Sequence, residues 1–354
     1  MVISLILLFL ACLSLSFIEE RLRSLDKIFL FGVLAIAMIL IAGLREVGST
    51  PDTEAYSDMY YGKYEAVLES VTEPTFTFIS KILNSFSLSV TSLFLTYAII
   101  STIIHLSFFW KFSKFPFLTL TIYISYYYMM HDMVQIRAGV AAGLFLWAVY
   151  YFAESRKKLS LCFIFMGILF HYSATTGLVI FLFNDKLPKW QRIFLYSIIP
   201  IGFVAYFTNI DISYLIPEDL WGTKLVAYRE MKEKGLEDDI AGWPLEINIL
   251  IWMNIILYCA SIYYHEFLTK QCKLVPIAIK AMAVGFFCLF FLKGFSQVLG
   301  NRLNDYFSIV SIILWTISIY AFYPRIISKI VSNLISTVRF VTSMLAYALS
   351  LYFL

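Results

Sequence analysis

Long runs of apolar residues, separated by short polar segments, extend along the whole sequence. Runs of about eighteen or more apolar residues are typical of membrane-spanning helices. The runs are continuous and do not alternate between apolar and polar positions, which disfavours a membrane β-barrel. The pattern therefore predicts an all-α fold, a polytopic integral membrane bundle of about 10–12 transmembrane helices. We expect this bundle to form a single transmembrane domain over residues 1–354.

The apolar runs also give the expected positions of the helices. We expect helices near residues 2–18, 28–44, 90–110, 115–131, 134–153, 159–183, 191–208, 246–267, 274–292, 303–323 and 334–354. The first of these is predicted to be a membrane helix and not a secretory signal, because no basic residue precedes the run and no small-x-small cleavage site follows it. The segment Pro74–Leu88 is more polar and shorter, so we expect an interfacial helix or a re-entrant piece there.

Composition agrees with a membrane protein and limits its ligands. The 354 residues are 60% hydrophobic and 14% charged, whereas about a quarter of the residues in a soluble domain are charged. The net charge of +3 does not indicate nucleic-acid binding, because the basic residues lie in short loops between apolar runs. The five cysteines have no metal-ligand spacing, and we expect no structural disulfide.

Lysine and arginine in the short loops predict the orientation, since cytoplasmic loops are enriched in these residues. The segments predicted to be cytoplasmic are 19–27, 111–114, 154–158, 186–192, 269–273 and 324–329. The two long polar segments, 45–73 and 209–245, are then extracytoplasmic loops. Within the second loop, residues 225–234 have helical composition, and Gly235 is the expected stop.

The apolar run 159–183 conflicts with this scheme, because the loops on both of its sides are basic. A single crossing would place one basic loop outside. Alternatively, the run consists of two half-helices that return to the cytoplasmic side. The sequence "FHYS" (170–173) would then form a turn at membrane depth, where irregular backbone is tolerated only if protein or water lines it.

Ionisable residues beside apolar runs are candidates for function, because each needs a partner or water at the membrane. Arg45 follows an apolar run in "GLREVGSTPDTEAY", and Asp52 comes seven residues later. Alone, Arg45 is typical of an arginine that reaches the lipid headgroups, and Asp52 is typical of a turn residue. Together they place a cationic and an anionic group near one interface.

Two further candidates lie in the middle of the chain. Arg137 in "HDMVQIRAGVAAG" is about one turn into its predicted helix, before Gly139 and Gly143 at the spacing of close helix packing. It either binds a ligand or pairs with Asp132 or a neighbouring helix. His171 in "FHYSATTG" is either a packing residue or a base, since histidine ordinarily has a pKa near neutrality.

The remaining candidates are Arg229, Arg302 and Tyr306. In "GNRLNDYF", Arg302 and Tyr306 are four residues apart on one predicted helical face, with Asp305 as a local ion partner of the arginine. Arg229 lies in the second polar loop and is a solvated surface group unless that loop folds over a site. Aromatic residues either stack on sugar rings or anchor the chain at the membrane interface, and the candidates are Tyr56, Tyr306, Trp221 and Trp243.

Several arginines near one face favour an anion larger than a single carboxylate, because guanidinium groups offer bidentate donors to phosphate oxygens. A lipid-linked phosphate or diphosphate at the interface fits this requirement. The sequence contains no glycine-rich nucleotide loop after a strand, no HExxH motif and no clustered pair of acids. We therefore expect neither a cofactor nor a metal.

Four short motifs resemble the EpsG family, within the broader group of Wzy-type O-antigen and polysaccharide polymerases. They are "GLREVGSTPDTEAY", "QIRAGVAAG", "LFHYSA" and "NRLNDYF", and their order covers roughly residues 40 to 310. The stretch between Gly48 and Asp52 is longer than in many members of the family. The resemblance implies a GT-C-like glycosyltransferase that joins undecaprenyl-diphosphate-linked oligosaccharide units into O-antigen, capsule or exopolysaccharide.

The resemblance also implies where the reaction occurs and which residues perform it. The protein would lie in the bacterial inner membrane with its active site facing the periplasm. Its donor and acceptor would be lipid-linked oligosaccharides, and a flippase and a chain-length regulator would be its protein partners. His171 or Asp52 would be the base. Arg45, Arg137 and Arg302 would stabilise the departing diphosphate, with Arg229 as a loop clamp.

Two other functions share parts of this pattern. An O-antigen ligase uses the same donor and transfers the sugar chain to the lipid A core. A lipid-linked oligosaccharide flippase, or another transporter, would favour a polar track through many helices, whereas the ionisable groups here gather near one predicted face. A purely structural membrane subunit would leave the arginines without a ligand.

Overall fold

The structure is a computed structural model that describes residues 1–50, 52–63, 72–211, 223–233, 235, 245, 248–320 and 325–352. Every regular element in these ranges is a helix. The predicted all-α fold is therefore confirmed for the described part of the chain.

Five of the described helices are long and apolar enough to cross a membrane. They are α2 (Ser24–Gly43), α6 (Val90–Phe112), α8 (Ile136–Ala153), α10 (Lys189–Phe207) and α17 (Arg325–Tyr352). Four shorter apolar helices accompany them: α1 (Val2–Ile18), η2 (Tyr172–Leu182), α12 (Ile249–Tyr263) and α14 (Val275–Phe291). These helices identify the chain as a polytopic helical membrane protein.

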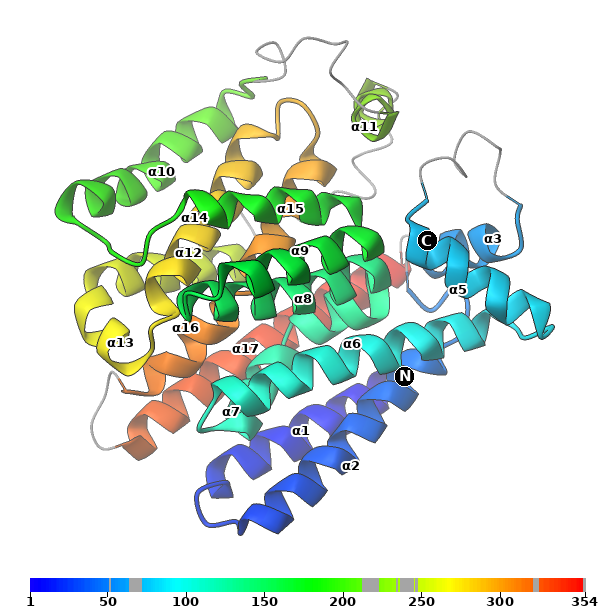
Figure 1. Cartoon of the computed structure of the whole chain (residues 1–354), viewed down its shortest axis with the longest axis horizontal. Helices are drawn as coiled ribbons and strands as arrows, with labels where there is room; N and C mark the ends of the chain where they lie inside the picture. The colour runs from blue at the N-terminus through cyan, green and yellow to red at the C-terminus, as the bar shows by residue number, and fades with distance from the viewer. Residues whose placement is uncertain are drawn as a thin grey trace. The chain divides into compact units, whose positions relative to one another are not determined.

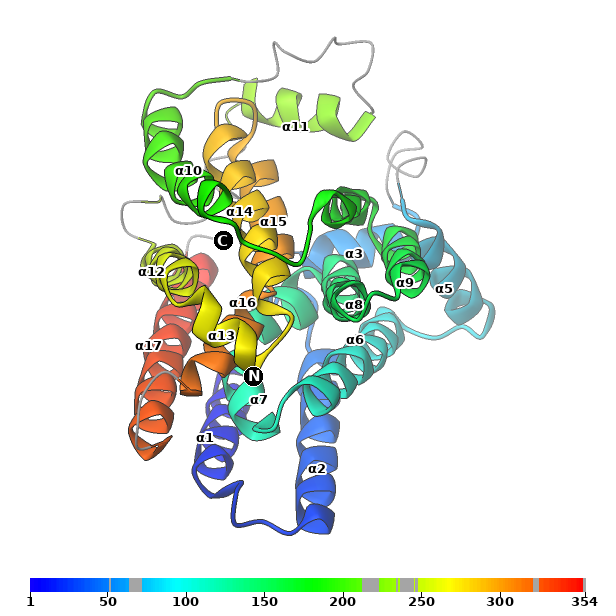
Figure 2. The same cartoon turned by 60° about the vertical axis from the view of Figure 1, so that its left-hand side comes forward.

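The chain forms two compact units. Unit 1 consists of Met1–Leu178 and Trp315–Leu354, and unit 2 of Val179–Leu314. Besides α1, α2, α6, α8 and α17, unit 1 contains α3 (Thr53–Tyr60), α5 (Pro74–Ser85), α7 (Pro116–Ile124), η1 (Tyr128–Val134) and α9 (Lys157–Phe170). Within unit 1, α1 lies beside α2, and α8 lies beside α9 (Figures 1 and 2).

Unit 2 is built around α14, which packs against α10, α12 and α15. Its other described helices are α11 (Thr223–Glu233), α13 (His265–Gln271) and α15 (Gln297–Ser308). The expected helix in residues 225–234 is confirmed by α11, and Gly235 after it has a φ of +69°, as a glycine stop requires. The expected helix at 246–267 is divided into α12 and α13.

The prediction of a single helix at residues 303–323 is wrong. Instead, α15 ends at Ser308, and the chain bends by 42° before α16 (Ser311–Ile317) begins. α16 continues directly into η5 (Ser318–Tyr320). The sequence did not show the start of α15 because "QVLGNRLND" is polar, although its N-cap serine, Ser296, accepts a hydrogen bond from the Leu299 amide at 3.2 Å.

The last helix begins earlier than the expected residue 334, at Arg325. One face of it is polar and buried and includes Lys329, Asn333 and Arg339, whereas Ile330 and Leu334 are exposed. Lys329 Nζ lies 3.7 Å from Glu19 Oε1, and Asn333 Nδ2 donates to Ser16 Oγ at 2.9 Å. A search for apolar runs misses such a segment, because its polar face points toward α1 and its apolar face points outward.

The apolar run 159–183 is broken at His171. Here α9 ends, His171 adopts an extended conformation, and η2 begins at Tyr172. A Cβ built on Gly167 would lie 3.4 Å from Ala174 Cβ. Seven residues along a continuous helix span about 10 Å, so α9 does not continue through this break. The side of the membrane at which η2 ends stays a prediction.

Glycines permit the close packing that surrounds this break. A Cβ on Gly139 would collide with the backbone carbonyl of His131 in η1, and a Cβ on Gly143 would lie 3.0 Å from the His105 ring on α6. A Cβ on Gly43 would lie 2.8 Å from Leu95 Cα. The close packing predicted for Gly139 and Gly143 is therefore confirmed.

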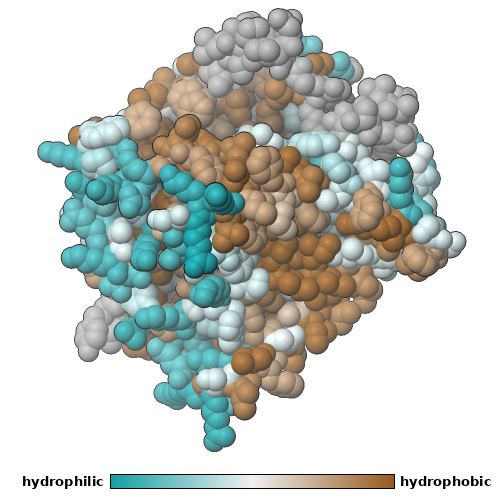
Figure 3. Space-filling view, in the orientation of Figure 1, coloured by the Kyte–Doolittle hydropathy of each residue, from teal (hydrophilic) through white to brown (hydrophobic). Residues whose placement is uncertain are grey.

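The surface of unit 1 is apolar where its helices face outward. Over α6 and α9 the surface is strongly apolar (Figure 3). Ile103 on α6 and Phe165 on α9 are more than half exposed. Exposed side chains of this size on a helix long enough to cross a membrane, such as α6, are suited to contact lipid and not water.

Candidate functional site

Three helix ends in unit 1 bring a carboxylate, an arginine and a histidine together. Glu73 is the N-cap of α5, Arg137 lies in the first turn of α8, and His171 follows the last residue of α9. Glu73 Oε2 accepts a hydrogen bond from Arg137 Nη1. Glu73 Oε1 lies 3.0 Å from His171 Nδ1. We call these three residues the bridged cluster.

Local sequence explains how the bridged cluster is placed. Pro74 is the first residue of α5, where its missing N–H costs no hydrogen bond, and this places Glu73 at the N-cap. Thr75 Oγ1 donates to the Leu169 carbonyl at 2.8 Å and joins α5 to the end of α9. On the other side, Gly139 lets η1 approach α8, and the π-helical turn of η1 leads directly into the helix that carries Arg137.

The bridged cluster lies against a buried aromatic wall. The Glu73 side chain is fully buried, and the Arg137 side chain is 18% exposed. The Arg137 guanidinium lies 5.3 Å from the Tyr56 ring centre and 5.4 Å from the Phe76 ring centre. Attraction between a cation and the ring faces adds to the ion pair. Apolar surroundings of this kind strengthen the charge interactions inside them.

Arg45 lies on the same aromatic core, packed on Phe94 at 4.2 Å from the ring centre. It is 5% exposed, and its Nη1 donates to the Ala42 carbonyl. Its Nε and Nη2 atoms are buried and find no acceptor among the described residues. Burial lowers the pKa of the Arg45 guanidinium to about 10, while Tyr56, Tyr128 and Asp132 act in the opposite direction.

The loop after Arg45 is held rigidly. Gly48, with a φ of +82°, donates its amide to Thr53 Oγ1 at 3.0 Å, and Thr50 Oγ1 donates to the Met133 carbonyl at 3.2 Å. Asp52 is the N-cap of α3 and half-buried. The helix that it starts carries Tyr56 to the Arg137 guanidinium.

The bridged cluster and Arg45 lie at the helix ends opposite the basic turns of unit 1. α8 begins beside Arg137 and ends at the turn 154–158, and α2 begins after residues 19–23 and ends beside Arg45. The 18 residues of α8 span about 27 Å. This length separates Arg137 from the basic turn 154–158, and it is comparable to the thickness of a bilayer core.

The other predicted site residues lie in unit 2. Arg302 Nη1 donates to Tyr228 OH at 3.1 Å. Arg229 Nη1 lies 3.2 Å from Asp211 Oδ2, and its Nε lies 3.0 Å from Glu233 Oε1. We call these five residues the loop cluster. Tyr306, predicted to contact substrate, is buried in the core of unit 2.

The structure thus brings Arg137 and His171 together through Glu73. In the sequence, Glu73 is only the last residue of the polar segment 45–73. The single signal that could have found it is its position before Pro74 at a helix start, since a carboxylate is favoured there. The suggested pairing of Arg137 with Asp132 is wrong, because Asp132 instead accepts hydrogen bonds from Ser101 Oγ and Tyr123 OH.

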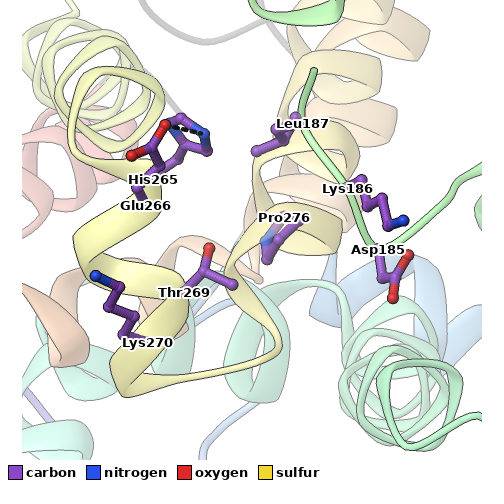
Figure 4. A pocket seen from close by; sticks show the side chains of 8 residues that line it. All are labelled: Asp185, Lys186, Leu187, His265, Glu266, Thr269, Lys270 and Pro276. Atoms are coloured by element: carbon purple, nitrogen blue, oxygen red, sulfur yellow. Dashed lines mark ion pairs between the residues drawn. The ribbon is translucent and has the colours of Figure 1, made fainter. Parts of the chain in front are cut away.

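A cavity of about 400 Å³ lies elsewhere, in unit 2. It is bounded by the segment 185–187, by α13 and by Pro276, and the side chains of Lys186 and Lys270 point away from its centre (Figure 4). None of the predicted site residues lines it. In the part of the chain that the structure describes, no group of three or more His, Cys, Asp or Glu residues could hold a metal ion.

Comparison with known proteins gives one result. Neither the curated proteins nor the solved structures contain a match to this chain. A protein-family model matches this chain from residue 28 to residue 353, a range that includes every residue of the bridged cluster. That range is nearly the whole sequence. The chain belongs to the EpsG family, a family of Wzy-like polymerases.

Proposed function

We propose that this protein is a membrane glycosyltransferase that joins oligosaccharide units carried on a lipid diphosphate. The observation that carries the proposal is the buried Arg45 guanidinium, two of whose nitrogen atoms find no acceptor among the described residues. Buried donors without acceptors are costly, more so on a charged group. A diphosphate supplies both the negative charge and oxygen acceptors in the geometry that a guanidinium recognises.

The reaction follows from this assignment. His171 takes the proton from a hydroxyl of the acceptor sugar, and the hydroxyl oxygen bonds to the anomeric carbon of the donor. The bond between that carbon and the diphosphate breaks, and the lipid diphosphate leaves with the electron pair. Arg45 stabilises the charge that develops on the leaving group. No nucleotide sugar is consumed, because the lipid diphosphate is itself the leaving group.

Membership of the EpsG family supports polymerisation as the outcome. The positions of the helix ends support the extracytoplasmic face, since the basic turns of α2 and α8 lie at the other ends. In a bacterium, that face of the inner membrane is periplasmic. The expected lipid is undecaprenyl diphosphate, and the expected product is O-antigen, capsule or exopolysaccharide. Arg229 and Arg302 are assigned to the sugar chain or to the diphosphate of a second lipid-linked unit.

Reconstitution tests the proposal directly. The purified protein in lipid nanodiscs is incubated with lipid-linked repeat units isolated from cells of the source organism that lack this gene. Dimers and longer lipid-linked products, formed without nucleotide or added metal, are the expected result. Recovery of only the starting unit, from protein that is monodisperse and folded, would overturn the proposal. Transfer to a lipid A core without elongation would instead identify a ligase.

A further inference from the structure

We propose that Glu73 is the positioning residue of His171, and that Arg137 is the counter-ion of Glu73 and not a ligand of the diphosphate. This inference rests on the proposed function. It starts from the geometry of one carboxylate, whose two oxygens serve two different partners. Oε2 accepts from Arg137 Nη1, and Oε1 lies 3.0 Å from His171 Nδ1.

The contact at Oε1 determines where the imidazole carries its proton. An ionised carboxylate only accepts hydrogen bonds, so its histidine partner must donate through Nδ1–H. The lone pair of the neutral ring is then on Nε2. Nε2 is therefore the atom of His171 that accepts the proton from the sugar hydroxyl, and without Glu73 the ring would be distributed between two tautomers.

The contact at Oε2 supplies the counter-charge that a carboxylate needs to stay ionised at the fully buried position of Glu73. A buried carboxylate without a counter-charge tends to take up a proton, which would turn it from an acceptor into a donor. The Arg137 guanidinium supplies the counter-charge, and the rings of Tyr56 and Phe76 hold that guanidinium in place. Arg137 thus acts on His171 through Glu73.

The charge balance of the cluster also suits the reaction. Before the reaction, Glu73 and Arg137 cancel each other and His171 is neutral. After His171 accepts the proton, the imidazolium is adjacent to the Glu73 carboxylate, which stabilises it. The cluster then carries one net positive charge while the lipid diphosphate departs with negative charge. The two charges attract at the step where the bond to the donor breaks.

Two hydrogen bonds to the backbone around His171 hold this arrangement in place. Thr75 Oγ1 donates to the Leu169 carbonyl, two residues before His171, at 2.8 Å. The Tyr172 amide lies 3.5 Å from Glu73 Oε1, the oxygen that also faces the imidazole. The start of α5 and the break after α9 are therefore connected on both sides of the histidine.

The first test separates turnover from binding. With the reconstituted protein, Glu73→Gln should lower kcat about 100-fold or more, while the affinity for lipid-linked donor changes less than about threefold. Glu73→Asp should recover part of kcat. The matched control is Glu54→Gln, because Glu54 is an exposed carboxylate on the neighbouring helix α3. That control should retain the kcat of the unsubstituted protein.

The second test reads the proton position without any turnover. Solid-state ¹⁵N NMR of protein labelled at histidine distinguishes Nδ1–H from Nε2–H, and the His171→Gln spectrum identifies the His171 signals among the four histidines. The unsubstituted protein should show mainly the Nδ1–H form. Glu73→Ala should shift the ring toward the Nε2–H form. Because this readout does not depend on polymerisation, it remains valid if the proposed function is wrong.

Removal of one charge can disturb folding, so a double variant completes the design. Glu73→Gln with Arg137→Gln removes both charges at once and should fold as well as the unsubstituted protein, with kcat no lower than that of Glu73→Gln alone. Arg137→Gln alone should lower kcat and leave donor affinity unchanged. The inference is overturned if Glu73→Gln keeps kcat within about twofold, or if Glu73→Ala leaves His171 mainly in the Nδ1–H form. Loss of donor affinity in Arg137→Gln would also overturn it, since Arg137 would then be a ligand.

Discussion

The bridged cluster in unit 1 and the loop cluster in unit 2 both contain arginines paired with acids, yet they differ in burial. Glu73 is fully buried, and Arg137 is 18% exposed. In the loop cluster, Arg229 is 26% exposed, and its partner Glu233 is 62% exposed. Helix ends and an aromatic wall fix the first cluster, whereas the second depends on α11, whose flanking residues 212–222 are outside the described part of the chain.

This difference decides which cluster is suited to chemistry. Charge interactions at exposed positions are screened by water and salt and contribute between nothing and about 1 kcal/mol. Buried interactions are stronger and keep their geometry during the reaction. We therefore assign proton transfer to the bridged cluster, and contacts with the sugar chain or a second diphosphate to the loop cluster. Four predictions test this division, in order of decreasing effect.

The largest effect is expected at His171. His171→Gln should lower kcat by about 10²- to 10⁴-fold, the usual contribution of a general base, and should spare donor binding. Polymer ladders and donor affinity of the reconstituted protein measure the two quantities. The matched control is His265→Gln, because His265 lies in unit 2 and its Nδ1 lies 3.0 Å from the Ile262 carbonyl of its own chain segment. Loss of donor binding in His171→Gln would make His171 a ligand and not a base.

A smaller effect, on binding, is expected at Arg45. Arg45→Lys keeps the charge but removes the planar pair of donors, so the KM for lipid-linked donor should rise roughly tenfold. Arg23→Lys is the matched control, because Arg23 is the exposed N-cap at the other end of the same helix, α2. An unchanged KM in Arg45→Lys, with the protein folded, would remove Arg45 from the diphosphate site.

An effect on stability is expected at Gly139, two residues after Arg137. A methyl group there would collide with the His131 carbonyl, so Gly139→Ala should destabilise the protein by about 1–3 kcal/mol. Thermal unfolding in detergent measures the change. Gly32→Ala is the control, because among the described residues no atom apart from the neighbouring backbone of α2 lies within 4 Å of a Cβ at Gly32. Equal melting temperatures for both variants would show that the contact between η1 and α8 does not hold the bridged cluster.

The smallest effect is expected in the loop cluster. Arg229→Gln should change kcat/KM less than about fivefold, and the change should shrink further at high salt, because both of its ion pairs are partly exposed. Arg302→Gln should behave similarly. A loss of 100-fold or more in either variant would break the division between the clusters and place the reacting atoms at the unit 2 loop.

Much of the site was predictable as a set of residues but not as an arrangement. Arg137 was recognised because an arginine one turn into an apolar helix needs a partner, and that partner is Glu73. Glu73 was missed because it follows a polar loop and looks solvated in the sequence. Sixty-four residues separate the two in the chain, and no local pattern encodes such a contact. Trp221 and Trp243, which could stack on sugars, lie outside the described residues.

The fold, too, has features that the sequence predicts and features that depend on tertiary contacts. Apolar periodicity gave the approximate bounds of α1, α2, α6, α8, α10 and α14, because lipid requires a continuous apolar surface on each spanning helix. It did not give the start of α17, the bend between α15 and α16, or the assignment of α5 to a helix start beside the site. These features depend on polar residues, and the free energy of burying those residues depends on partners that other helices supply.

The sequence by itself therefore determined that this protein is a polytopic helical membrane protein of the EpsG family, and it identified Arg45, Arg137 and His171 as unusual residues. The tertiary structure decided what surrounds them. It placed a buried carboxylate between Arg137 and His171 and left two donors of Arg45 without an acceptor among the described residues. The physical reason is that apolar burial depends on the composition of one segment, whereas the energy of a buried charge depends on the few atoms that the fold brings next to it.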